Sequence, residues 1–158
     1  MFITPLTDED FLEGFDCGIL ALNIFITKNA INYQKSFASK TYLLKSEEKI
    51  VGFYSISATV IEQNQVDIRW PKHPLPAILL GRLGVDLRFQ GKGLGGVLFA
   101  DVCKKVLTVS DIIGCVGLVT DSKDDSALKF YQRFGMKPFK NKPKTLFLSA
   151  KEIKKYIQ

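Results

Sequence analysis

The chain has 158 residues, of which 46% are hydrophobic and 24% charged, and these proportions are typical of a single globular domain with a sizeable core. No apolar run approaches the roughly 20 residues that a bilayer-spanning helix needs, and the first residues lack the basic and apolar segments of a secretory signal. Three widely spaced cysteines and one histidine exclude a zinc site and favour the reducing cytoplasm. We therefore expect one cytoplasmic domain over residues 1–158, with no metal and no membrane segment.

The first part of the chain is expected to form a strand, a helix and a hairpin. Residues 2–6 favour a short strand, and the acidic stretch 8–15 is expected to form a first helical turn. Apolar residues at helical spacing predict a helix over residues 21–37. Two stretches rich in β-branched and aromatic residues, 40–46 and 49–62, predict a hairpin with a charged turn between them.

The middle of the chain is expected to place a buried strand before a glycine-rich segment. Residues 63–76 are polar and interrupted by prolines, which predicts a loop. The mostly apolar stretch 77–87 predicts a strand buried on both faces. After the glycine-rich segment, apolar residues at helical spacing predict a helix as far as about residue 108.

The last part of the chain is expected to add two strands and two helices. Residues 114–120 predict a buried strand, and residues 124–135 predict a helix that begins with capping-type residues and stops at a glycine. A last strand over residues 144–150 and a basic helical tail over residues 151–158 complete the chain. This order of elements predicts an α/β (α+β) fold, with a mixed sheet and helices packed on it.

The segment RFQGKGLGG, residues 88–96, combines four glycines with positive charge and follows a predicted strand. Bare backbone at a helix start can bring its N–H groups close to the oxygens of a phosphate. The string matches R-x-x-G-x-G from Arg88 through Gly91 to Gly93. We therefore predict that this loop holds a phosphate-bearing ligand.

Two other nucleotide loops fit the sequence less well. The string also contains G-x-G-x-x-G at Gly91, Gly93 and Gly96, with Asp111 at a suitable distance for a dinucleotide site. About 90 residues of hairpin-rich chain precede it, however, and too little chain follows for a substrate domain. The G-x-x-x-x-G-K-[ST] pattern of a nucleoside-triphosphate loop is absent.

A second motif lies in ALKFYQRFGM, residues 127–136. With R-x-x-G-x-G it resembles the GNAT acetyltransferase superfamily, whose A-x-x-F-Y-x-x-x-G-F segment it matches except for Met136 in the last position. FDCGILALNIFITKNA, KIVGFYSISA and LLGRLGVD further resemble the GNAT toxins of bacterial toxin–antitoxin pairs, which acetylate the α-amine of aminoacyl-tRNA. The chain departs from that pattern at Phe25, where tryptophan is usual, and at Gly84, where alanine is usual. Neither change removes a reactive group.

The resemblance implies the GNAT fold, a twisted and mostly antiparallel sheet of about six to seven strands, and acetyl-CoA as the acetyl donor. It implies that the Val85 backbone amide faces the thioester oxygen and that Tyr131 is the general acid that protonates the leaving thiolate. Close packing is an alternative reason for glycine at position 84. The residues implied in acetyl-CoA binding are Leu83, Gly84, Val85, Arg88, Phe89, Gln90, Gly91, Lys92, Gly93, Leu94, Gly95 and Gly96.

The remaining side chains bear on the base and the acceptor. Asp124 and Asp125 read as helix caps, Cys103 and Cys115 read as core residues, and no carboxylate stands out as a general base. Residues 1–79 carry a net charge of −2 and residues 80–158 a net charge of +8, which favours an anionic acceptor such as RNA. The basic residues predicted to contact tRNA are Arg133, Lys137, Lys140, Lys142 and Lys144.

The sequence thus favours an N-acetyltransferase that modifies aminoacyl-tRNA and blocks translation. The resemblance also implies a ribbon-helix-helix antitoxin as a partner and is compatible with a homodimer. Two alternatives stay open: acetylation of a small amine or of a peptide or protein N-terminus, and a GNAT-like module that binds coenzyme A or RNA without turnover. The intact loop and Tyr131 argue against the second alternative.

Overall fold

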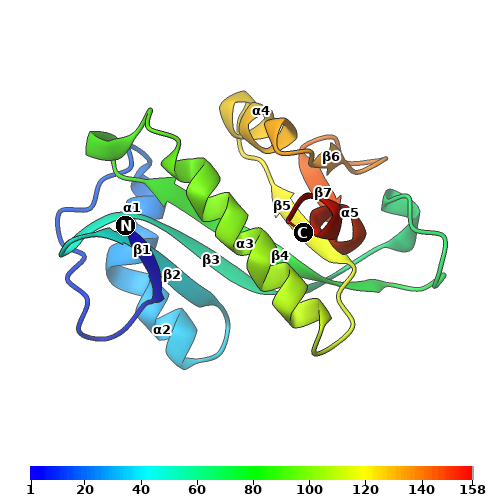
Figure 1. Cartoon of the computed structure of the whole chain (residues 1–158), viewed down its shortest axis with the longest axis horizontal. Coiled ribbons are helices and arrows are strands. Elements are labelled where there is room, and N and C mark those ends of the chain that lie inside the picture. The colour runs from blue at the N-terminus through cyan, green and yellow to red at the C-terminus, as the bar shows by residue number, and fades with distance from the viewer. Residues whose placement is uncertain (158) are drawn as a thin grey trace. The chain divides into compact units, whose positions relative to one another are not determined.

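The computed structural model describes residues 1–157, which form a seven-stranded mixed sheet with helices, in the strand order β1-β2-β3-β4-β5-β7-β6 (Figure 1). The expected fold class is confirmed. In chain order the elements are β1 (Phe2–Pro5), α1 (Leu20–Ile24), η1 (Phe25–Asn29), α2 (Ala30–Lys35), β2 (Lys40–Ser46), β3 (Lys49–Ile61), η2 (Gln63–Gln65), β4 (Leu75–Val85), η3 (Leu87–Phe89), α3 (Leu94–Ser110), β5 (Gly117–Asp121), α4 (Asp125–Arg133), β6 (Lys137–Pro138), β7 (Thr145–Ser149) and α5 (Ala150–Ile157).

The chain divides into two compact units, and the divisions fall within β3, β4 and α3. The first unit, called the loop unit here, comprises Met1–Ser57 and Gly81–Val102 and contains the glycine-rich segment. The second, called the tyrosine unit, comprises Ala58–Leu80 and the chain from Cys103 onward, and contains Tyr131. The expectation of a single domain over residues 1–158 stays a prediction.

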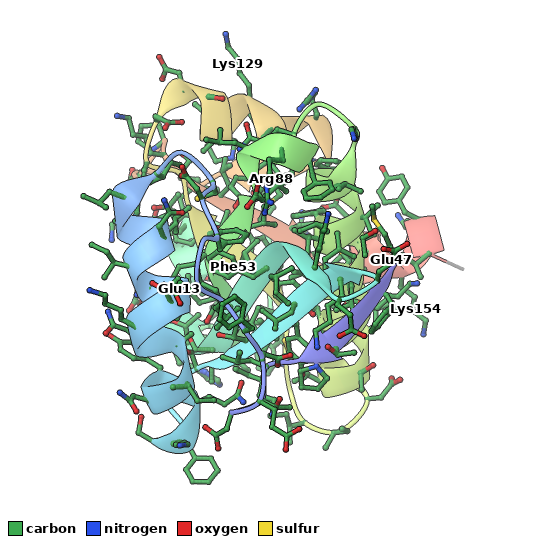
Figure 2. The ribbon with its side chains drawn as sticks, turned by 90° about the vertical axis from the view of Figure 1, so that its left-hand side faces the viewer. Glu13, Glu47, Phe53, Arg88, Lys129 and Lys154 are labelled. Atoms are coloured by element: carbon green, nitrogen blue, oxygen red, sulfur yellow. The ribbon has the colours of Figure 1, made fainter. Side chains whose placement is uncertain are left out.

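In the loop unit, β1, β2 and β3 form an antiparallel ladder, and the expected hairpin turns at Glu47 with a positive φ of 58°. The core of this unit is aromatic. Phe53 on β3, labelled in Figure 2, is fully buried. Its ring meets the Phe15 ring edge-on, with 5.6 Å between the ring centres, and stacks on the Phe25 ring at 6.3 Å. Edge and stacked geometries of this kind stabilise a core beyond the area that they bury.

The predicted first helix is present as α1 and α2, joined by the π-helical turn η1. The Arg82 guanidinium of β4 lies 3.7 Å from the centre of the Phe25 ring in that turn, a cation–π contact. The prediction of a helical turn over residues 8–15 is wrong, because this stretch forms only isolated turns. The Asp10 carboxylate instead accepts from the Thr7 N–H at 2.7 Å and from Lys45 at 2.6 Å, and Gly14 has a φ of 88°.

In the tyrosine unit, β5 pairs in parallel with β4 over two residue pairs and antiparallel with β7 over five. The helix α4 begins as predicted, since the Asp124 carboxylate accepts from the Ala127 N–H at 2.8 Å. Gly135 follows the helix with a φ of 91°, as a left-handed C-terminal residue does. The two-residue strand β6 was not expected, and Gln158, the end of the expected basic tail, lies outside the described residues.

No helix of residues 1–157 is both long enough and apolar enough to span a bilayer. The same part of the chain contains no group of three or more metal-ligating side chains.

Candidate functional site

The buried carboxylate of Asp86 fixes the turn between β4 and the glycine-rich segment. It accepts from the Arg88 N–H at 2.9 Å and from Arg88 Nε and Nη2 at 2.9 and 3.1 Å. The Asp16 N–H also donates to Asp86 at 3.3 Å, and the Asp16 carbonyl accepts from the Leu87 N–H at 2.8 Å. Chain segments 70 residues apart are therefore joined directly beneath the loop.

The charge on Asp86 is maintained by these donors. Burial alone raises the pKa of Asp86, but the hydrogen bonds and the positive charge of Arg88, with the N–H of Asp16, outweigh burial and hold that pKa below its usual value. Asp86 is consequently ionised at neutral pH. The guanidinium of Arg88, labelled in Figure 2, donates two of its N–H groups to this carboxylate. The Arg88 side chain nevertheless stays 63% exposed.

Gln90 anchors the other side of the turn. Its side-chain amide donates to the Cys17 carbonyl at 3.0 Å and to the Val85 carbonyl at 2.8 Å. The side chains of Asp86 and Gln90 thus hold the loop from two sides. In this conformation Gln90 directs its amide at protein carbonyls, and its predicted contact with acetyl-CoA stays a prediction.

The loop itself presents free backbone. Gly91 and Gly93 both have a φ of 78°, which favours glycine, and no atom of the described residues lies within 4 Å of a methyl group built on either. Within residues 1–157, the N–H groups of residues 91–96 have no hydrogen-bond acceptor. The last three of these, Leu94, Gly95 and Gly96, form the first turn of α3, where the positive end of the helix dipole lies.

This loop fits a pyrophosphate. Its donors are unpaired, the space above the glycines is open, and Lys92 is exposed beside them. Lys92 and Arg88 each lie 5.6 Å from the centre of the Phe89 ring, which gathers both cations at the loop. The residues listed for acetyl-CoA between positions 83 and 96 are brought together in the loop unit, and their individual contacts with the ligand stay predictions.

Glycine at position 84 has a packing reason. A methyl group on Gly84 would lie 3.2 Å from the Phe53 ring and 3.3 Å from the sulfur of Cys17. Both neighbours are buried, so little room exists for them to move. The packing alternative is therefore supported. The predicted roles of Leu83 and of the Val85 amide at the thioester stay untested.

Tyr131 lies in the tyrosine unit, on α4, and the residue is 8% exposed. Burial raises the pKa of Tyr131 to about 12, and a hydrogen bond with the Thr120 side chain acts in the opposite direction. The phenol is therefore protonated at neutral pH, as a proton donor must be. Neither the contribution of Thr120 nor that of Asp86 was expected from the sequence.

The other candidate side chains have structural surroundings. Burial raises the pKa of Cys103 to about 12, so its thiol is not a nucleophile at neutral pH. Arg133, Lys137, Lys142 and Lys144 are exposed in the tyrosine unit. Lys140 is also exposed, but its ammonium pairs with Asp67 at 3.1 Å.

Residues 10–136 match the model of the acetyltransferase (GNAT) family. The chain belongs to this family. The predicted recognition is confirmed, because the matched range includes both the glycine-rich loop and the tyrosine segment.

The relatives of this GNAT chain include toxins. A tRNA-acetylating toxin of Mycobacterium tuberculosis is 27% identical over 155 residues, which covers 96% of this chain and 93% of that protein. The structure of AtaT complexed with acetyl-methionyl-tRNAfMet superposes with a TM-score of 0.92 at 28% identity, and the match covers 99% of both chains. A tyrosine-to-phenylalanine variant of AtaT, bound to the C-terminus of its antitoxin AtaR and to acetyl-CoA, superposes with a TM-score of 0.86 at 27% identity, over 99% of this chain and 98% of that one.

Proposed function

We propose that this protein is an N-acetyltransferase toxin that moves the acetyl group of acetyl-CoA to the α-amino group of aminoacyl-tRNA. The amine nitrogen attacks the thioester carbonyl, a C–N bond forms and the C–S bond breaks. The nitrogen loses one proton to solvent, and Tyr131 gives its proton to the departing thiolate. An N-acetylated aminoacyl-tRNA has no free amine for peptide-bond formation, so translation stops.

The observation that carries the donor half of this proposal is the glycine loop. A run of backbone N–H groups at the start of α3, without acceptors in the part of the chain that the structure describes and beneath open space, suits the pyrophosphate of acetyl-CoA. Membership of the GNAT family and the acetyl-CoA bound to the AtaT variant support the same ligand.

The acceptor half rests on charge and on the relatives. The sequence segments of the tyrosine unit carry 14 basic and 7 acidic side chains, a net charge of +7. A surface of this sign attracts the phosphates of RNA without reading its sequence. A free α-amine has a pKa of about 8, and the neighbouring ester lowers it further, so no strong base is needed. The tRNA-acetylating relative and the tRNA-bound AtaT also support aminoacyl-tRNA as the acceptor.

The same likeness supports the partner and the compartment. AtaT binds the C-terminus of the antitoxin AtaR, and we infer that this chain is likewise paired with an antitoxin, of the ribbon-helix-helix type, in the cytoplasm. A toxin directed at translation has its substrate in that compartment.

Replacement of Tyr131 by phenylalanine tests the function. The variant keeps the ring and its packing but lacks the proton, so acetyl transfer to aminoacyl-tRNA should fall about a hundred- to ten-thousand-fold. Acetyl-CoA affinity should stay near the parent value. The assay incubates protein, labelled acetyl-CoA and a charged tRNA pool and measures N-acetyl-aminoacyl-tRNA. Expression of the parent should arrest growth, and Tyr131→Phe should relieve the arrest.

The control is Tyr156→Phe, because Tyr156 is 78% exposed on α5 and should leave transfer unchanged. Label that appears only on small amines or peptides would contradict the tRNA acceptor and leave an acetyltransferase. Acetyl-CoA binding without any transfer by the parent would instead identify a non-catalytic module.

A further inference from the structure

The segment 16–18, which precedes α1, is hydrogen-bonded to the turn that leads into the glycine-rich loop. The Asp16 carbonyl accepts from the Leu87 N–H at 2.8 Å. The next carbonyl along the chain, that of Cys17, accepts from the Gln90 side chain at 3.0 Å. Two successive peptide groups of the segment therefore hold the turn, one near its beginning and one at its end.

The other edge of the same segment is held by Asn23, on α1. Its side-chain oxygen accepts from the Cys17 N–H at 2.9 Å, and its amide nitrogen donates to the Asp16 carboxylate at 2.9 Å. The same carboxylate oxygen accepts from the Gly18 N–H at 2.8 Å. These partners determine the orientation of the Asn23 amide, because the reverse orientation would place an NH2 group against an N–H and an oxygen against a carboxylate.

Each of the two peptide groups is thus hydrogen-bonded on both sides. The N–H and the carbonyl of a trans peptide point in opposite directions. In the first group the N–H is bonded to Asn23 and the carbonyl to Leu87. In the second group the N–H is bonded to the carboxylate that Asn23 also contacts, and the carbonyl to Gln90. Hydrogen bonds in such chains polarise and strengthen one another, so the Asn23 side chain is connected to both ends of the turn.

We propose that Asn23 is a positioning residue for acetyl-CoA binding: its side chain fixes the segment 16–18, which in turn holds the glycine-rich loop in the conformation that receives the pyrophosphate. The role rests on the proposed acetyl-CoA site at that loop, and it requires no contact between Asn23 and either substrate. The apparent Kd of a ligand that binds one loop conformation is its intrinsic Kd divided by the populated fraction of that conformation. Release of the segment should therefore weaken acetyl-CoA binding without changing the chemistry that follows.

The test compares Asn23→Ala with Asn32→Ala. Asn32 is exposed on α2 in the same unit, and both substitutions change helix propensity equally. Asn23→Ala should raise the Kd and the KM for acetyl-CoA about tenfold with an unchanged kcat, as expected if the binding conformation falls to about one tenth of the population. Asn32→Ala should change none of these values. Calorimetric titration well below the Tm of each variant measures the Kd under conditions in which a loss of global stability has no effect.

Two outcomes of this comparison would overturn the proposal. One is a folded Asn23→Ala protein with the parent Kd for acetyl-CoA. The other is a fall in kcat at an unchanged KM for acetyl-CoA, which would place Asn23 at the chemical step or the acceptor. If thermal unfolding shows that the alanine variant does not fold, Asn23→Asp removes only the donor to Asp16, and Asn32→Asp then serves as the control with the same change in charge.

A double variant tests the route through the segment. Gln90→Met keeps the length of the side chain but removes the amide that reaches the Cys17 carbonyl. One of the two connections between Asn23 and the turn is then already lost, so adding Asn23→Ala should raise the Kd only about threefold more. An increase of about tenfold in both backgrounds would overturn the proposal, because Asn23 would then act independently of this segment.

A spectroscopic readout keeps this proposal separate from the proposed function. In protein labelled with 15N-glycine, the Gly93 amide resonance is the one missing from Gly93→Ala. That resonance should move in Asn23→Ala and stay in place in Asn32→Ala. The measurement uses the protein without ligand, so a chain that fails to bind acetyl-CoA or to acetylate aminoacyl-tRNA still reports on Asn23. A Gly93 resonance that does not respond to Asn23→Ala would overturn the proposal.

Discussion

Gly93→Ala is the sharpest perturbation of the donor site, and its effect can be divided into strain and lost binding. Gly93 has a φ of 78°, where an L-residue costs about 1–2 kcal/mol. For a chain of this length that loss lowers the Tm by about 2–8 °C. Alanine clashes with nothing in residues 1–157, because no atom of that part of the chain lies within 4 Å of the added methyl group.

The loss of affinity should be larger than the strain. The methyl group enters the open space above the loop, which the pyrophosphate is proposed to occupy. Losing two hydrogen bonds to that charged group, at about 1.5–3 kcal/mol each, weakens binding at least about a hundredfold. Calorimetric titration with acetyl-CoA measures the change in Kd, and thermal unfolding measures the strain.

Gly14→Ala supplies the matched control. Gly14 is also exposed, has a φ of 88°, and has no atom within 4 Å of a built methyl group. Both variants should therefore lose similar stability, while only Gly93→Ala loses acetyl-CoA. A folded Gly93→Ala protein with the parent Kd would refute the assignment of the loop. Equal losses of affinity in the two variants would show that strain alone explains the effect.

Two other sites give quantitative expectations. Asp86→Asn should lower the free energy of unfolding by about 1.5–3 kcal/mol at pH 7, because the buried carboxylate accepts two backbone N–H groups. The pKa of Asp86 is lowered in the folded state. Its stabilisation is therefore fully present above the unfolded pKa of about 4 and is lost as the pH falls through the folded pKa. Urea unfolding at pH 7 and pH 3 should accordingly show a smaller difference between parent and variant in acid. Replacing Lys142 and Lys144 by glutamate should weaken the use of aminoacyl-tRNA several-fold and flatten its salt dependence while sparing acetyl-CoA binding. Lys40 and Lys49, exposed in the loop unit, give a double glutamate control with the same change in charge, and equal losses in both variants would point to net charge and not to a footprint.

Local patterns predicted most of the elements. The helix after the glycine loop, the capped helix at Asp124 and the β2–β3 hairpin each depend on residues close together in the sequence. The prediction of a helical turn over residues 8–15 was wrong. The acidic composition of this stretch resembles a helix start, but Asp10 is held by Lys45 on β2, a residue far away in the sequence. The strand β6 is two residues long, too short for any period to be visible.

The contacts that support the candidate site could not be predicted from the sequence, for a different reason. Asp16 and Asp86 are 70 residues apart, and Thr120 bonds to a carbonyl 40 residues earlier. No spacing rule connects such positions. An acidic residue between a strand and the glycine loop was a visible signal for Asp86, but only the structure shows that it binds Arg88. Tyr131, the proposed proton donor, was predictable because its motif lies within ten consecutive residues.

The charges of the two units indicate that the two anionic substrates are recognised by different interactions, one short-range and one long-range. The loop unit has a net charge of −1, from 8 basic and 9 acidic side chains, so its own net charge does not attract acetyl-CoA. Its affinity must come from short-range interactions, namely the N–H groups of residues 91–96, which are little screened by salt, and the exposed cations Arg88 and Lys92 at the loop. The +7 of the tyrosine unit acts over a distance and is screened. A polyanion such as tRNA has to be drawn in and oriented over many phosphates, whereas one pyrophosphate has only to fit, and each unit carries the kind of interaction that its proposed ligand requires.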